Sequence, residues 1–325
     1  MMPHKFHLFF IFLLISLCAC GQLDKETNIH FEKATKLFNN KEYESALIYV
    51  DKVIEKYPTD YFSWTLKGRI LFNLRKDAEA LKALDKAIEL NPKYYEAYGH
   101  RAVLCSSIGK CSQNQIINDF DMALIGKPND TKLIERKAYY LYKSGLFIQC
   151  IEECNKIFKF EPNNYYGFML RAPAYKKLGK NELALKDYNQ AIDINPKENF
   201  AYAERGLFFT EQEKYDEAVK DFDKSLELIS KKNNDPDFLI LKAYDLNNRG
   251  FAYFKLGNAE KALIDMNTSL ELLSTNSYAY KNRALVYLSK REKNKGCADL
   301  QKALELGYTQ KYGDEVEVLI KKYCK

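Results

Sequence analysis

Five prolines recur at nearly constant spacing and constrain the fold of this chain more than any other feature. Pro58, Pro92, Pro128, Pro162 and Pro196 are separated by 34, 36, 34 and 34 residues. Such a period is typical of repeat architectures, in which one supersecondary unit stacks on the next. Because proline lacks a backbone donor and disfavours helix in the preceding residue, each proline is expected to end a helical unit.

The prolines set a register of 34 slots, in which residues of the same kind recur. Slot 1 falls at residues 27, 61, 95, 131, 165, 199, 243 and 277. Slot 8 holds only small residues: Ala34, Gly68, Ala102, Ala138, Ala172, Gly206, Gly250 and Ala284. Each repeat also contains two runs with apolar residues at i, i+3, i+4 and i+7, which predict a pair of amphipathic helices. The small residues let the two helices approach closely.

This pattern resembles the tetratricopeptide repeat, and the resemblance covers about residues 27–308. It implies an all-α fold, a right-handed α-α solenoid of about eight helix hairpins. A capping helix is expected within residues 309–325, because a terminal repeat needs a cover over its apolar face. Ten extra residues, 233–242, contain Asp235-Pro236, a typical helix start, and predict an elongated first helix in the seventh repeat.

Opposite charges recur together in the register. Slot 7 is arginine and slot 23 is aspartate in the same five repeats, at Arg101 and Asp119, Arg171 and Asp187, Arg205 and Asp221, Arg249 and Asp265, and Arg283 and Asp299. The matched occurrence predicts that each arginine pairs with the aspartate of its own hairpin. The alternative is a row of arginines that binds an anionic ligand.

The first twenty residues have the pattern of an export signal. Lys5 precedes an apolar run from Leu8 to Cys20, which is too short to cross a bilayer and is typical of a secretory signal peptide. Its end, Leu17-Cys18-Ala19-Cys20, resembles the lipobox of bacterial lipoproteins. The resemblance implies removal of residues 1–19, attachment of fatty acyl chains such as palmitate at Cys20, and a short tether, residues 20–26. The alternative is an ordinary signal peptide cut nearby.

The lipobox also implies a place for the protein: the bacterial cell envelope, anchored by lipid on the periplasmic face or the cell surface. An exported chain with an even number of remaining cysteines permits disulfides. The favoured pair is Cys297 with Cys324, which would clamp the capping helix. Cys105 with Cys111 would lock a turn in the third repeat. Other pairings stay open, since six cysteines allow 15 connectivities.

Composition and the motifs present argue against several classes of function. The 50 Lys and Arg against 44 Asp and Glu are mixed along the chain and form no basic stripe, so no nucleic-acid partner is expected. Cys150 and Cys154 are predicted to be buried thiols, because nothing supplies the remaining ligands of a tetrahedral metal site. No glycine-rich phosphate loop or nucleophile motif is present. We therefore expect no enzyme activity, metal or cofactor.

Binding is expected on the first helices of the hairpins. In tetratricopeptide repeat proteins, slots 2, 5, 9, 12 and 13 of these helices line a concave groove. The resemblance implies a groove with this lining: Phe62, Arg69, Phe72, Tyr139, Tyr142, Tyr166, Lys176, Phe200, Tyr244, Phe251, Phe254, Tyr278 and Lys281. Aromatic rings with scattered cations suit an extended peptide or a helix of a partner protein. The alternative is that many of the rings pack between repeats.

The sequence therefore predicts a membrane-anchored scaffold or adaptor that binds segments of other proteins. One alternative is an accessory lipoprotein for the assembly of pili or outer-membrane machinery. Another is a module that binds glycans or peptidoglycan, which would also use an aromatic groove. The oligomeric state stays open.

Overall fold

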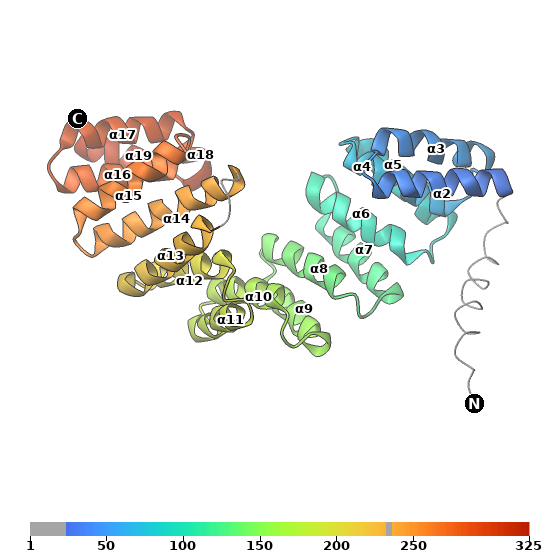
Figure 1. Ribbon diagram of the computed structural model, residues 1–325, viewed down its shortest axis with the longest axis horizontal. Coiled ribbons are helices and arrows are strands. Elements are labelled where there is room, and N and C mark those ends of the chain that lie inside the picture. The colour runs from blue at the N-terminus through green and yellow to red at the C-terminus, as the bar shows by residue number, and fades with distance from the viewer. Residues whose placement is uncertain (1–23, 232–235, 325) are drawn as a thin grey trace. The chain divides into compact units, whose positions relative to one another are not determined.

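The described residues of the protein, 24–231 and 236–324 in a computed structural model, form an all-α fold. The chain divides into two compact units, Met1–Phe160 and Glu161–Lys325, called unit 1 and unit 2 below. Each unit consists of successive antiparallel helix hairpins (Figure 1). The predicted all-α hairpin architecture is confirmed.

Unit 1 contains the first four repeats. Its hairpins are α2 (Lys25–Asn39) with α3 (Tyr43–Lys56), α4 (Tyr61–Asn73) with α5 (Asp77–Leu90), α6 (Tyr95–Ile108) with α7 (Gln113–Gly126), and α8 (Thr131–Lys143) with α9 (Phe147–Phe160). The first helices contact one another in succession, α2 with α4, α4 with α6 and α6 with α8. These four helices are the first-helix layer of unit 1.

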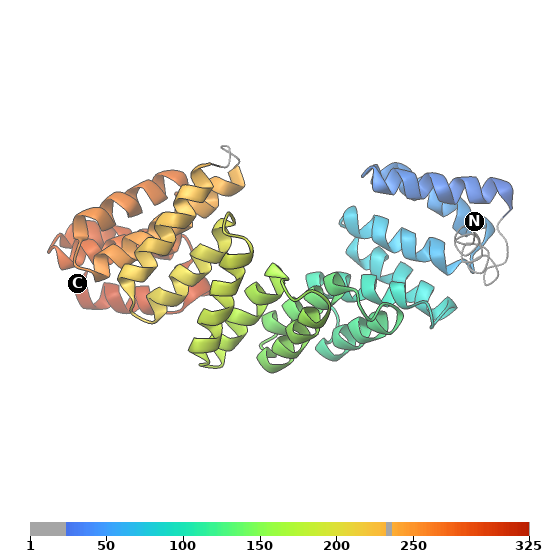
Figure 2. The same ribbon diagram turned by 60° about the horizontal axis from the view of Figure 1, so that its bottom comes forward.

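Unit 2 contains the last four repeats and the C-terminal helices. They are α10 (Tyr165–Lys177) with α11 (Asn181–Ile194), α12 (Asn199–Glu211) with α13 (Tyr215–Ser230), α14 (Pro236–Lys255) with α15 (Ala259–Leu272), α16 (Ser277–Ser289) with α17 (Lys293–Glu305), α18 (Tyr308–Tyr312) and α19 (Glu315–Tyr323). α14 begins at Pro236, so the elongated helix of the seventh repeat is confirmed. It lies beside α13 (Figure 2).

Short polar side chains fix where the first helices begin. The side chain of Asp60 accepts a hydrogen bond from the backbone N–H of Ser63, and that of Asp130 accepts one from Leu133. Asn164 caps α10 in the same way. Each of these residues follows a repeat-ending proline by two positions. The local sequence therefore both ends one hairpin and caps the next, since a capped helix start satisfies otherwise unpaired N–H groups.

The small residues of slot 8 allow the two helices of a hairpin to touch. A Cβ atom added at Gly68 would lie 2.6 Å from Cγ of Leu84 on the partner helix. One added at Gly206 would lie 2.9 Å from the ring of Phe222. The larger side chain therefore sits on the second helix, and the first helix leaves room for it.

Each predicted arginine–aspartate pair is present within its hairpin. Arg101 donates from Nε and Nη2 to the two carboxylate oxygens of Asp119, both at 2.7 Å. The same two-bond contact joins Arg171 to Asp187, Arg205 to Asp221, Arg249 to Asp265 and Arg283 to Asp299. The prediction that each arginine pairs with the aspartate of its own hairpin is confirmed.

The arginines also connect neighbouring hairpins, which the sequence analysis did not predict. Nη1 of Arg101 donates to Asp85 of the preceding hairpin at 2.7 Å, and Nη1 of Arg249 donates to Asp223 at 2.6 Å. In two other repeats an asparagine takes the place of this aspartate. Asn189 accepts the hydrogen bond from Nη1 of Arg205, and Asn267 accepts the one from Nη1 of Arg283. One guanidinium therefore holds three helices together.

The C-terminal cap consists of two helices where one was expected. α18 and α19 are separated at Gly313, whose φ of 93° lies in a region that L side chains rarely adopt. Val316 of α19 is fully buried against Leu300 and Ala303 of α17. The structure also joins Cys297 of α17 to Cys324, just after α19. The end of the last hairpin is thereby covered.

Two further points concern the predicted N-terminal segment and the cysteines. The signal peptide and the lipobox residues lie outside the described residues. α2 begins at Lys25, within the expected tether, because Asp24 caps it by accepting a hydrogen bond from the N–H of Thr27.

A second disulfide joins Cys105 to Cys111. The thiols of Cys150 and Cys154, both on α9, are buried, as predicted. Among the described helices, none has both the length and the apolar character needed to cross a bilayer.

Candidate binding site

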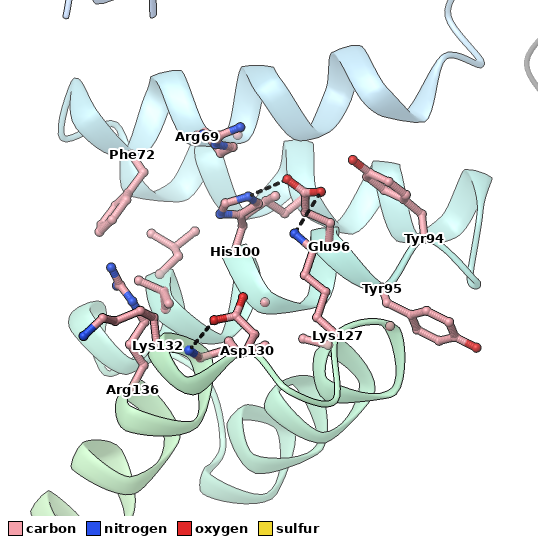
Figure 3. Close-up of a pocket in the computed structure, with 18 of the residues that line it drawn as sticks. Arg69, Phe72, Tyr94, Tyr95, Glu96, His100, Lys127, Asp130, Lys132 and Arg136 are labelled. Carbon is pink, nitrogen blue, oxygen red and sulfur yellow. Dashed lines mark hydrogen bonds and ion pairs between the residues drawn. The ribbon is translucent and has the colours of Figure 1, made fainter. Parts of the chain in front are cut away.

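The first-helix layer of unit 1 contains a cavity of about 540 Å³. It is formed by α4, α6 and α8, with loop residues at its edge (Figure 3). Apolar side chains make much of its lining: Phe38, Phe72, Leu84, Val103, Leu104 and Leu133. An apolar cavity of a few hundred Å³ with a few polar groups is the usual form of a ligand site.

The polar part of the lining is strongly cationic. Its charged residues are Arg69, Lys93, Lys127, Lys132 and Arg136 against the carboxylates Glu96 and Asp130. The carboxylate of Asp130 caps α8, and Lys132 pairs with Glu135 at 3.0 Å. The cavity therefore carries a net positive charge and is complementary to an acidic ligand.

Glu96 is the carboxylate of the lining that contacts its basic side chains. Its Oε1 lies 3.5 Å from Nε2 of His100, and its Oε2 lies 3.7 Å from Nζ of Lys127 (Figure 3). These contacts lower the pKa of Glu96 to about 2, with His100 the largest cause and Lys127 and Arg69 acting in the same direction against the effect of burial. Glu96 is thus ionised throughout the physiological range.

Aromatic rings form one rim of the cavity. Tyr94 packs against Tyr61 and Phe62 with ring centroids 5.0 Å apart in each pair. The guanidinium of Arg69 lies 4.6 Å from the ring centroid of Phe38. Such rings offer rigid apolar contact area next to the cationic groups.

The structure brings together some of the unit 1 residues predicted to form a groove. Arg69 and Phe72 line the cavity, whereas Phe62 is outside the lining and packs against Tyr94, which belongs to it. Tyr139 is 55% exposed on α8 and does not line the cavity. Tyr142 packs against Phe147 within its own hairpin, with centroids 5.7 Å apart.

In unit 2, three predicted aromatic residues are exposed on successive first helices. Tyr166, Phe200 and Tyr244 have exposed fractions of 59%, 46% and 44%. Lys176 is not available as an isolated cation, because its Nζ pairs with Glu211 at 2.9 Å. These three rings are therefore individually accessible, and the cation predicted beside them is already paired.

Four predicted residues of unit 2 pack against other side chains, and for Lys281 the prediction of an open groove position needs correction. Lys281 is only 4% exposed, because α19 covers it and Glu315 approaches its Nζ to 3.3 Å. Tyr278 stacks on Tyr308 of α18, with ring centroids 6.1 Å apart. The other two, Phe251 and Phe254, pack against the core formed by Ala262, Met266 and Val286. The capping helix thus buries Lys281, whereas Tyr278, Phe251 and Phe254 stay half-buried.

Several residues of the cavity lie outside the slots that predicted a groove. His100 and Arg136 occupy slot 6, outside the groove slots of the resembled family, although both lie one residue after slot 5. Lys93, Tyr94 and Lys127 precede a first helix, where no helical register applies. Within the described ranges, no group of three or more His, Cys, Asp and Glu is arranged to hold a metal ion.

Comparison with known proteins supports the repeat assignment. Two segments, residues 61–94 and 169–234, match family models described as tetratricopeptide repeat. One segment lies in each unit. The matches and the stacked hairpins together define the fold as the tetratricopeptide repeat solenoid type, a class of proteins that generally bind other proteins.

Individual proteins are similar at low identity. The chain is 27% identical over 161 residues to a DnaJ homolog subfamily C member 3 homolog of Dictyostelium discoideum, covering 43% of this chain and 32% of that protein. It is 25% identical over 188 residues to stress-induced-phosphoprotein 1 of Caenorhabditis elegans, covering 48% and 58%. The chain thus spans less than two thirds of either relative.

Among solved structures, the APC/C hetero-tetramer Cut9-Hcn1 contains a chain of similar fold. The TM-score is 0.61 at 17% identity, and the similarity covers 96% of this chain and 58% of the other. At this identity the likeness concerns the fold alone.

Proposed function

We propose that this protein is a scaffold that binds an acidic segment of a partner protein in the cavity of unit 1. The observation that carries the proposal is the lining itself, in which five cationic side chains face two carboxylates above an apolar floor. Acidic side chains of the segment would pair with the arginines and lysines. Its apolar side chains would pack on Phe72, Leu104 and Leu133. No chemical reaction is proposed.

Removing two cavity cations should weaken binding of an acidic ligand. Lys127→Ala combined with Arg136→Ala is expected to reduce affinity about a hundredfold or more, because each of the two charge-assisted contacts contributes about 1.5–3 kcal/mol when formed. The measurement is fluorescence anisotropy with a short labelled peptide of alternating Glu and Leu. Lys86→Ala with Lys224→Ala, two lysines outside the cavity that pair with Glu89 and Glu227, is the matched control. Equal affinities of the two double variants would locate binding elsewhere.

We further propose that the scaffold is attached to a bacterial membrane by lipid at Cys20. The lipobox residues support this proposal, and so do two disulfides, since such bonds persist in exported proteins. Only four residues separate Cys20 from the start of α2 at Lys25. Unit 1 would then work close to the membrane surface, within the cell envelope.

The anchoring proposal predicts that a single substitution changes the cell fraction in which the protein is found. Cys20→Ala should move the protein from the membrane to the soluble fraction, because the acyl chains would supply the buried CH₂ groups that hold it there. The check is detergent-phase partitioning of protein expressed in bacteria. Cys18→Ala is the matched control, since it leaves the acceptor thiol in place. Retention of the Cys20→Ala protein in the detergent phase would refute lipid anchoring.

A further inference from the structure

The cavity of unit 1 already contains an acidic group of its own. The carboxylate of Glu96 lies where a carboxylate of a bound segment would meet the cations, with His100 on one oxygen and Lys127 on the other. A ligand carboxylate entering the cavity therefore adds a second negative charge beside Glu96. A further positive charge beside Glu96 would hold the ligand carboxylate more tightly.

His100 is the group that can supply this charge. Its Nε2 is buried and makes no hydrogen bond of normal length among the described residues, since Glu96 Oε1 is 3.5 Å away. Burial is the main cause that lowers the pKa of His100 below its usual value, and the positive charges of Arg69 and Lys127 act in the same direction. Glu96 opposes them. In the free protein His100 is therefore neutral near pH 7.

The charged groups around His100 come from α4, α6 and α8 and from the segments that precede α6 and α8. α4 contributes Arg69, and the segment before α6 contributes Lys93. Lys127 follows α7, and Asp130, Lys132 and Arg136 belong to the start of α8. Glu135 of α8 is held by Lys132, and α5 adds only the apolar Leu84 to the lining.

We propose that the imidazole of His100 takes up one proton when the cavity binds an acidic segment, so that binding strengthens as the pH falls. The inference rests on the proposed function of this cavity. The proton comes from solvent, and the neutral imidazole becomes an imidazolium that lies between Glu96 and the incoming carboxylate. No covalent bond other than the new N–H forms.

The sign follows from linkage. A carboxylate bound beside the ring favours the imidazolium, so the pKa of His100 is higher in the complex than in the free protein. Affinity is then greatest below both values and declines as the pH rises through the bound-state value. A tenfold stabilisation of the imidazolium in the complex corresponds to affinity about threefold to sixfold tighter near pH 5.5 than near pH 7.5. Glutamates of the ligand stay ionised over this range.

The test measures binding of the Glu-Leu peptide to the full chain at both pH values, with the matching Gln-Leu peptide as the uncharged control. The wild type should bind the acidic peptide about threefold to sixfold tighter near pH 5.5 than near pH 7.5. His100→Gln should flatten this dependence. His30→Gln, on α2 and outside the cavity lining, should keep it. Calorimetry in two buffers of different ionisation enthalpy should show proton uptake in the wild type and its loss in His100→Gln.

The outcomes separate this inference from the function on which it rests. Equal affinity at both pH values overturns proton coupling and leaves the acidic-segment site intact. A pH dependence that persists in His100→Gln assigns the proton to another group and also overturns the inference. Absence of binding to the acidic peptide at either pH overturns both.

Discussion

Replacing Arg101 by methionine is expected to lower the free energy of unfolding by about 3–5 kcal/mol, because removal of one member of a buried ion pair leaves the other charge without compensation. The side chain of Asp119 is 0% exposed and accepts two hydrogen bonds from Arg101. Methionine preserves the length of the side chain but offers no donor. Urea denaturation followed by circular dichroism measures the loss.

The double variant Arg101→Met with Asp119→Leu distinguishes the stranded charge from lost packing. It should recover most of the stability, since well-packed apolar residues often replace a buried pair without cost. Lys86→Met, which breaks an exposed pair with Glu89, should cost less than about 0.5 kcal/mol. Equal losses in the single and double Arg101 variants would contradict the pairing.

Removal of the Cys297–Cys324 disulfide by serine at both positions should cost about 3–4 kcal/mol, because the crosslink restricts the unfolded chain over 27 residues. The matched removal of Cys105–Cys111, with a separation of 6 residues, should cost less, about 2 kcal/mol. Both variants are compared with the oxidised wild type by urea denaturation.

Reduction of the wild type provides the internal check. Under a strong reductant the three proteins should unfold at nearly the same urea concentration, because the variants then differ from the wild type only by sulfur and oxygen. A greater loss for the short disulfide than for the long one would show that loop closure is not the main contribution. It would point instead to specific packing around Cys105.

Much of the fold was predictable because it is determined locally. The repeat-ending prolines and the polar residues that follow them define where α4, α8 and α10 begin, and those starts agree with the expected register at Tyr61, Thr131 and Tyr165. The Arg–Asp pairs were also predictable, since both partners lie in one hairpin. A pattern confined to about 34 residues is visible in a single repeat and is reinforced by its copies.

The site was less predictable because it depends on several hairpins at once. Arg69 and Phe72 occupy groove slots and do line the cavity. The charge state of Glu96 and His100, by contrast, depends on their contact with each other and on Lys127, which comes from a loop. The error at Lys281 has the same origin. Its environment is set by Glu315, which belongs to the cap rather than to a repeat, and no register within one hairpin contains that contact.

The direction of the arginine contacts has a consequence for biosynthesis. Arg101 bonds to Asp119 of its own hairpin and to Asp85 of the one before it, and Arg249 likewise reaches back to Asp223. Among the described residues, the hydrogen-bond partners of Arg101 and Arg249 lie in their own hairpin or in the one made before it. A nascent chain emerging from the ribosome, or from an export channel, can therefore neutralise each arginine as soon as its hairpin closes, and maturation can advance steadily from the amino end.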